Sequence, residues 1–130
     1  MKNIFKKRLS QLTDQISDIG YNGLYITNLT NIRYLTGFSG SAAVLLIING
    51  ESYFLTDGRY IKQSADQVKN SKILIIDSGY LSTINKHKLL IQPNLKIGFE
   101  SNHLSVSDYT NLTQYFSHIN WDPTSAIIEN

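Results

Sequence analysis

The sequence predicts an α/β domain in which a mixed sheet carries helices on its faces. Strand-like runs alternate with helix-like segments along the chain, and one pair of β-rich runs is joined by a hairpin signal. A hairpin is antiparallel, whereas strands joined through helices are usually parallel, so both directions are expected in one sheet. The length of 130 residues matches a single domain.

The amino-terminal segment is expected to be an amphipathic helix. Its apolar residues recur at spacings of three and four and so share one helical face; they are Phe5, Leu9, Leu12, Ile16 and Ile19. Gly20 follows at the place of a left-handed cap. The run GLYIT (23–27) then reads as a strand, and NLTNIRYLTG (28–37) supplies a polar cap, a short helical turn and a terminating glycine.

The clearest pattern is the hairpin in SAAVLLIINGESYFLTD (41–57). The run from Ala42 to Ile48 is apolar at every position, as in a central strand covered on both faces. Asn49-Gly50 tolerates the positive φ values of a tight turn. Beyond the hairpin, Asp57 is expected to cap a helix that ends at about Val68. Its predicted apolar stripe consists of Tyr60, Ile61, Ala65 and Val68.

The second half of the chain continues the alternation of strand and helix. The runs KILIID (72–77), LKIGFE (95–100) and HINWD (118–122) are expected to be strands. A helix is predicted from Leu81 to Leu90. Another is predicted after Ser105, which has the spacing of a capping box with Asp108. That helix is expected to carry Tyr109, Leu112 and Phe116.

Composition limits the classes of function. Apolar residues at 42% fit an ordinary globular core, and a net charge of +2 without a basic stripe argues against nucleic-acid binding. The chain has no cysteine, which fits a reducing compartment, and its first twenty residues lack the unbroken apolar stretch of a secretory signal. We therefore expect a cytoplasmic protein that binds neither nucleic acid nor a membrane.

The residues alone predict no catalytic set. The histidines His87, His103 and His118 lie far apart and lack the spacing of zinc ligands, so they are expected on the surface or in loops. The sequence contains no G-x-S-x-G elbow, P-loop or dinucleotide-binding fingerprint. The residues alone therefore predict no metal site and match no known catalytic motif.

Two motifs leave alternatives open. GFSGS (37–41) is either a tight turn that leads into the central strand or a small anion-binding nest of backbone amides. In TDGRY (56–60), Asp57 and Arg59 are either a catalytic carboxylate with an anion clamp or a helix cap with a structural ion pair, and we favour the second. Arg33 is either ion-paired or solvated, or it reaches a substrate carboxylate.

The order of these motifs is specific. TNLTNIRYLTGFSGSAAVLLI, followed at hairpin distance by YFLTDGRYIKQSADQ and later by IGFE, resembles the amino-terminal, creatinase-type domain of Xaa-Pro aminopeptidases and Xaa-Pro dipeptidases (prolidases). The likeness extends over nearly all of the chain, so residues 1–130 are expected to form that domain. The resemblance implies a mixed, roughly six-stranded sheet with helices on its faces, and a separate carboxy-terminal metallopeptidase domain that is absent from this chain.

The resemblance also implies a division of chemistry. In that family a dinuclear metal site, usually manganese or cobalt, is held by two Asp, one His and two Glu of the absent catalytic domain. This chain alone is therefore expected to be inactive and to hold no cofactor. Its parent protein is expected to hydrolyse peptides that have proline at the second position. A pseudopeptidase that only binds peptides or proteins stays an alternative, as does creatine hydrolysis, which the GFSGS loop disfavours.

Roles for individual residues follow from the same resemblance. In such enzymes the amino-terminal domain helps to build dimers or tetramers, and the loop after the Gly-Phe pair reaches the active-site mouth of a neighbouring subunit. We therefore expect a homo-oligomer. The residues expected to shape substrate access are Arg33, Phe38, Ser39, Gly40 and Ser41. Those expected to hold the helix start against the sheet are Asp57, Arg59 and Tyr60.

Overall fold

Helices and strands alternate along the chain, as expected for the α/β class. The computed structural model describes residues 2–125 and 127–128. The elements are α1 (Lys2–Asp18), β1 (Gly23–Ile26), α2 (Leu29–Thr36), β2 (Val44–Ile48), β3 (Glu51–Thr56), the 3-10 turn η1 (Gly58–Tyr60), α3 (Ile61–Gln67), β4 (Lys72–Ile75), α4 (Tyr80–Lys86), β5 (Lys96–Glu100), α5 (Val106–Tyr115) and β6 (Asn120–Thr124).

The strands form one mixed six-stranded sheet in the order β4-β3-β2-β1-β5-β6, which confirms the predicted fold class. Strand β2 is antiparallel to both of its neighbours, β1 and β3. The pairs β3–β4, β1–β5 and β5–β6 are parallel. Every strand except β2 therefore runs in one direction, and their carboxyl ends meet at one edge of the sheet. We call this the carboxyl edge; β2 begins there.

The predicted hairpin between β2 and β3 is confirmed. Asn49 and Gly50 adopt φ values of 50° and 84°, and Ile48 pairs with Glu51 across the turn. Positive φ at both turn residues matches the right-handed twist of the two strands. All residues of β2 are buried, as expected for a strand that is covered on both faces.

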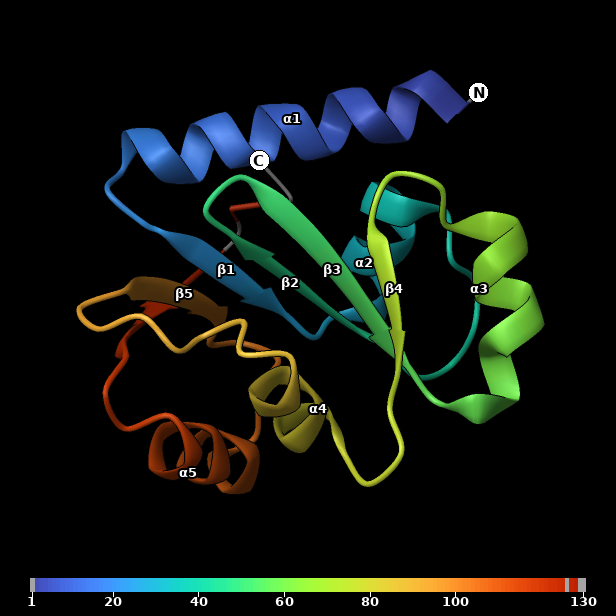
Figure 1. Ribbon diagram of the computed structural model, residues 1–130. Helices are drawn as coiled ribbons and strands as arrows, with labels where there is room; N and C mark the ends of the chain where they lie inside the picture. The colour runs from blue at the N-terminus through green and yellow to red at the C-terminus, as the bar shows by residue number, and fades with distance from the viewer. Residues whose placement is uncertain (1, 126, 129–130) are drawn as a thin grey trace.

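Two apolar cores lie on opposite faces of the sheet. Leu45 and Ile47 of β2 belong to the core under α1, α2 and α3, whereas Val44, Leu46 and Ile48 belong to the core under α4 and α5. This alternation follows from the two-residue period of a strand. Figure 1 shows α1 on one side of the sheet and α4 and α5 on the other.

The predicted apolar face of α1 is correct for Leu9, Leu12 and Ile16, which are buried. It is wrong for Ile19, whose side chain is 53% exposed. The helix ends at Asp18, and Gly20 adopts a φ of 94°, so Ile19 lies beyond the last helical residue, in the turn that leads to β1.

The predicted stripe of α3 is also wrong in two places. Ile61 is 58% exposed and Ala65 is exposed, whereas Ser64 and Val68 are buried. The segment after Asp57 begins as the 3-10 turn η1, which advances by about three residues per turn rather than 3.6. This tighter start rotates the buried face of α3 onto Ser64 and Val68.

Helix α4 is shorter than the predicted segment from Leu81 to Leu90. Lys88 adopts a φ of 56°, and the N–H of Leu89 donates to the carbonyl of Ile84 at 3.2 Å. This left-handed cap closes the helix and turns Leu90 into the core, where it is 2% exposed.

Helix α5 begins as predicted, because the hydroxyl of Ser105 accepts a hydrogen bond from the N–H of Asp108 at 3.0 Å. Of the side chains that this helix was expected to carry, Leu112 and Phe116 are buried and Tyr109 is 40% exposed. The strand predicted in HINWD is confirmed as β6.

Tyr21 links the start of β1 to the edge strand β6, since its hydroxyl donates to a carboxylate oxygen of Asp122. Burial, followed by this hydrogen bond and the charge of Asp122, raises the pKa of Tyr21 to about 12.

A tyrosine in an unfolded chain titrates near pH 10. The contribution of Tyr21 to stability is therefore complete below about pH 10 and is lost as the pH rises to about 12. A spectrophotometric titration of the tyrosines, from which the curve of Tyr21→Phe is subtracted, is expected to show the midpoint of Tyr21 at about pH 12. A midpoint near pH 10 would contradict the prediction.

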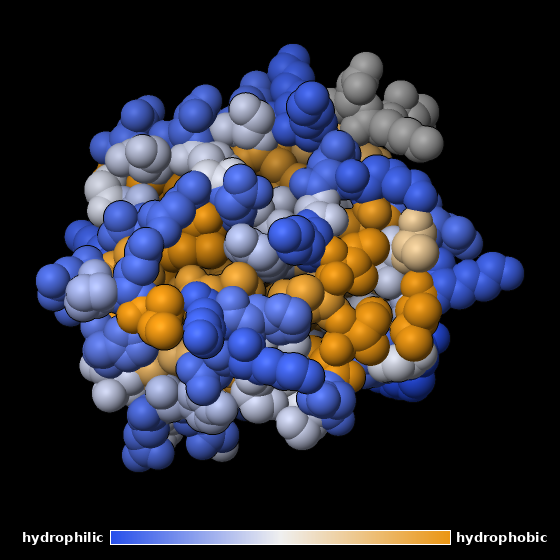
Figure 2. Space-filling view, viewed as in Figure 1, coloured by the Kyte–Doolittle hydropathy of each residue, from blue (hydrophilic) through white to orange (hydrophobic). Residues whose placement is uncertain are grey.

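Strand β4 forms an edge of the sheet with a partly open apolar surface. Ile75 is 37% exposed, and Leu74 and Ile76 are half-buried. Figure 2 shows apolar side chains gathered over β3 and β4, with polar side chains around them. We call Leu74 and Ile76, which lie on the same face of the sheet, together with the edge of strand β4, the β4 surface. Its combination of an edge strand with exposed apolar groups favours contact with another protein surface.

Candidate functional site

The glycine–serine loop (Gly37–Ser41) lies at the carboxyl edge, between α2 and β2. Its start follows from the sequence, because Gly37 adopts a φ of 85° and its N–H donates to the carbonyl of Arg33 at 2.8 Å, which ends α2. Beyond Gly37, some side chains of the loop are buried in the core and others lie at the surface. Ser39 and Ser41 are exposed, as is Arg33 on α2.

Phe38 lies inside the domain, with 1% of its surface exposed. Its ring packs edge-on against Phe54 at 4.8 Å and against Tyr60 at 5.4 Å between ring centroids. Its N–H donates to the hydroxyl of Thr36 at 3.1 Å. Of the five residues expected to shape substrate access, Phe38 therefore supports the loop from below, while Arg33, Ser39 and Ser41 present side chains to solvent.

The backbone of the loop is held by side chains from η1 and α3. The N–H of Ser39 donates to Oε1 of Gln67 at 3.0 Å, and the N–H of Ser41 donates to the hydroxyl of Tyr60 at 3.2 Å. Both amides thus have partners within the protein. This arrangement argues against the anion-binding nest, which needs amides that point at the ligand. Sequence reasoning missed Gln67, because no local pattern links residues that lie 28 positions apart.

Asp57 and Arg59 form a bidentate ion pair beside the loop. Arg59 donates from Nε to Oδ1 at 3.0 Å and from Nη2 to Oδ2 at 2.9 Å. The backbone N–H of Arg59 also donates to Oδ1 at 3.0 Å, so Asp57 caps η1. These hydrogen bonds hold the pKa of Asp57 below its usual range. Because the charges of both groups are paired, the geometry favours a cap and structural pair over an anion clamp.

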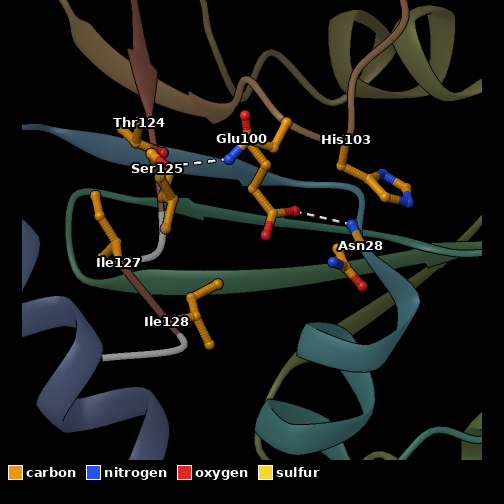
Figure 3. A pocket seen from close by; sticks show the side chains of 9 residues that line it. Asn28, Glu100, His103, Thr124, Ser125, Ile127 and Ile128 are labelled. Atoms are coloured by element: carbon orange, nitrogen blue, oxygen red, sulfur yellow. Dashed lines mark hydrogen bonds between the residues drawn. The ribbon is translucent and has the colours of Figure 1, made fainter.

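Glu100 joins three segments at the carboxyl edge. Its Oε1 accepts from the backbone N–H groups of Thr27 at 2.7 Å and Asn28 at 2.8 Å, and its Oε2 accepts from Nδ2 of Asn31 at 2.6 Å. Figure 3 shows the carboxylate turned toward the backbone of Asn28. A carboxylate with both oxygens occupied by donors is suited to fix the connection between β1 and α2. The sequence reasoning noted the IGFE strand without finding this role.

A small cavity of about 50 Å³ lies beside this carboxylate. Asn28, Glu100, His103 and Ile127 are among the residues that line it (Figure 3). Nδ1 of His103 lies 3.1 Å from the hydroxyl of Thr27. The volume accommodates about one or two water molecules and is too small for a peptide.

The described residues do not fit a metal centre. Across positions 2–125 and 127–128, no three His, Asp or Glu side chains converge to hold an ion. His103 contacts Thr27, whereas Nε2 of His118 lies 2.6 Å from the carbonyl of Leu90. Within these same positions, the helices are too short or too polar to span a lipid bilayer.

Residues 8–130 match the sequence profile of the Creatinase/Prolidase N-terminal domain. The chain belongs to this family. It is 31% identical over 122 residues to uncharacterized peptidase YqhT of Bacillus subtilis, covering 94% of this chain and 34% of that protein. It is 28% identical over 119 residues to probable Xaa-Pro aminopeptidase P of Laccaria bicolor, covering 88% of this chain and 18% of that protein. The chain thus spans about a third or less of the length of these relatives.

Solved structures agree with this assignment. The N-terminal domain of the cytoplasmic peptidase PepQ from Mycobacterium tuberculosis superimposes with a TM-score of 0.83 at 28% identity, covering 95% of this chain and 96% of that one. An Xaa-Pro dipeptidase from Bacillus anthracis gives the same TM-score and identity, covering 96% of this chain and 35% of the peptidase. This chain therefore covers nearly the whole of one solved chain and about a third of the other.

Proposed function

We propose that this chain is the non-catalytic amino-terminal domain of a Xaa-Pro peptidase that cleaves the peptide bond before proline. The observation that carries the proposal is its membership of the creatinase/prolidase N-terminal family, together with longer relatives named as an Xaa-Pro dipeptidase and a probable Xaa-Pro aminopeptidase, of which the chain covers 35% and 18%. In this proposal residues 1–130 are one domain, and a carboxy-terminal metallopeptidase domain follows. The protein is proposed to act in the cytoplasm, because its relative PepQ is a cytoplasmic peptidase.

The chemistry of hydrolysis is assigned to the second domain. Activating a water molecule and polarising a peptide carbonyl with metal ions requires a set of converging ligands, and the described residues offer none. Manganese or cobalt is proposed only for the catalytic domain. Of the polar groups at the carboxyl edge, Glu100 and Asp57 are engaged in hydrogen bonds within the domain, which supports a structural role for both.

The domain is proposed to contribute to substrate access and to oligomer formation. Substrate access is assigned to Arg33 and the glycine–serine loop, because Ser39 and Ser41 expose their side chains at the carboxyl edge on a well-supported backbone. Self-association to a homo-oligomer such as a dimer is assigned to the β4 surface, because an apolar edge strand is readily covered by a second copy.

The deciding experiment compares this chain with the product of its complete reading frame. Both are incubated with Mn²⁺ and, in separate reactions, with the dipeptide Ala-Pro and the tripeptide Ala-Pro-Gly; Ala-Gly and Ala-Ala-Gly serve as controls without proline. Release of alanine by the longer protein alone, and only from one or both of the proline peptides, is the expected result. If neither protein cleaves either proline peptide while the longer one binds one of them, the domain belongs to a peptide-binding pseudopeptidase and the proposed function is wrong.

A further inference from the structure

Gln67 of α3 contacts the glycine–serine loop with both ends of its amide. Oε1 accepts from the N–H of Ser39 at 3.0 Å, and Nε2 donates to the hydroxyl oxygen of Ser39 at 2.9 Å. Gln63 adds a second layer, since its Nε2 lies 3.1 Å from the same hydroxyl and 3.2 Å from Oε1 of Gln67. A single exposed serine thus makes three hydrogen bonds with one helix: its N–H donates one, and its hydroxyl oxygen accepts two.

The other end of the loop is held in the same manner by Tyr60. Its hydroxyl accepts from the N–H of Ser41 at 3.2 Å and lies 2.5 Å from the Ser41 hydroxyl. Gly40, between the two serines, lies directly over aromatic rings. A Cβ atom there would be 2.3 Å from Cζ of Phe38 and 2.9 Å from Cε1 of Tyr60, so the loop approaches the rings more closely than a side chain allows.

These contacts are unusual for an exposed loop. Backbone amides at the surface are ordinarily satisfied by water, and the segment then samples several conformations. Here the amides of Ser39 and Ser41 are both bound by side chains, and Phe38 anchors the segment in the core. A segment that is ordered before it meets a ligand loses little conformational entropy on binding.

We propose that Gln67 is a positioning residue, which presets the glycine–serine loop in the shape that contacts a proline-containing peptide. The identity of the ligand as a proline-containing peptide rests on the proposed function. The ordering of the loop by Gln67 does not. Gln67 acts through Ser39 and needs no contact with the substrate. Gln63 orients the Gln67 amide, and Tyr60 holds the Ser41 end.

Two substitutions of similar size separate hydrogen bonding from bulk. Gln67→Met keeps the length of the side chain but removes the acceptor for the Ser39 amide and the donor to the Ser39 hydroxyl. Gln67→Glu retains the acceptor, and the Ser39 hydroxyl can turn its proton toward the carboxylate. Gln11→Met, at an exposed position of α1, is the control for the exchange of glutamine by methionine.

The first measurement is hydrogen exchange of the Ser39 amide in this chain. Loss of one or two hydrogen bonds is expected to accelerate exchange in Gln67→Met by about five- to thirtyfold. The exchange rate of the Ser39 amide in Gln67→Glu and in Gln11→Met is expected to stay within about twofold of that in the unmodified chain. The exchange rate of the Leu46 amide is expected to stay within the same range in all variants. Unchanged Ser39 exchange in Gln67→Met, with the fold intact, would overturn the inference.

The second measurement uses the longer protein and whichever of Ala-Pro and Ala-Pro-Gly it cleaves faster. In Gln67→Met, KM is expected to rise about fivefold or more while kcat stays within about twofold, and Gln67→Glu is expected to restore KM. If exchange accelerates but KM does not change, the loop is ordered without serving the peptide and the inference is overturned. If the longer protein has no activity at all, the proposed function fails, and Ser39 exchange still decides whether Gln67 orders the loop.

Discussion

Glu100→Ala is expected to lower the free energy of unfolding by about 2 to 4 kcal/mol. The substitution removes the acceptor for the backbone N–H groups of Thr27 and Asn28 and for the side-chain amide of Asn31. Asn31 is 5% exposed, so water cannot readily replace the hydrogen bond that its side-chain amide loses. Loss of the anchor also frees the start of α2, where the side chain of Asn28 accepts from the N–H of Thr30 at 2.9 Å.

Urea unfolding followed by circular dichroism measures this effect. Glu100→Gln is expected to cost less, about 1 to 2 kcal/mol, because the remaining amide oxygen still accepts from the two backbone donors. Glu51→Ala removes an exposed carboxylate from the hairpin and is expected to change stability by no more than about 0.5 kcal/mol. Equal stability of Glu100→Ala and Glu51→Ala would show that the carboxylate is not a structural anchor.

Phe54→Ala is expected to cost about 3 to 5 kcal/mol of unfolding free energy. The Phe54 side chain is 0% exposed in the core under α1, α2 and α3. Its ring lies 4.8 Å from that of Phe38, so the substitution removes an aromatic pair as well as buried apolar area. The resulting cavity would lie beneath the glycine–serine loop, which Phe38 anchors.

The matched substitution is Phe54→Leu, which keeps most of the apolar volume and is expected to cost only about 1 to 1.5 kcal/mol. Denaturant unfolding of both variants gives the comparison. If alanine and leucine destabilise the domain equally, the cost comes from the aromatic contact alone and the cavity argument is wrong.

Local signals in the sequence predicted the elements well, because the responsible atoms are close together along the chain. Asn49-Gly50 supplies the two positive φ values of the hairpin, and Ser105 caps a helix through a residue three positions away. The same holds for Asp57 and Arg59, whose pairing spans two residues. Each of these features is decided by the conformational preferences of a few neighbouring residues.

Helix faces were less predictable where a neighbouring turn changes their phase. The hydrophobic periodicity after Asp57 assumed a regular α-helix, but η1 rotates the buried face away from Ile61 and Ala65. The end of α4 was missed for a related reason. Lys88 is an unusual residue for a left-handed cap, so nothing in its identity indicated the turn.

The polar contacts of the candidate site could not be predicted from sequence patterns. Glu100 finds its backbone partners 72 and 73 positions away, and Gln67 finds Ser39 across 28 positions. These pairings depend on which strand ends share the carboxyl edge, and that is a property of the sheet order. A glutamine in KQSADQ reads as an ordinary surface residue of a helix until α3 is placed beside the loop.

The direction of β2 has a practical consequence for labelling this protein. The glycine–serine loop precedes β2, and the Asn49-Gly50 turn follows it, so the two lie at opposite ends of a five-residue strand. At about 3.4 Å per residue the strand separates them by roughly 17 Å. Since the chain has no native cysteine, a cysteine introduced at the exposed position Glu51 would be its sole thiol for a thiol-reactive label. A fluorophore coupled there would report on the domain while leaving the carboxyl edge unobstructed.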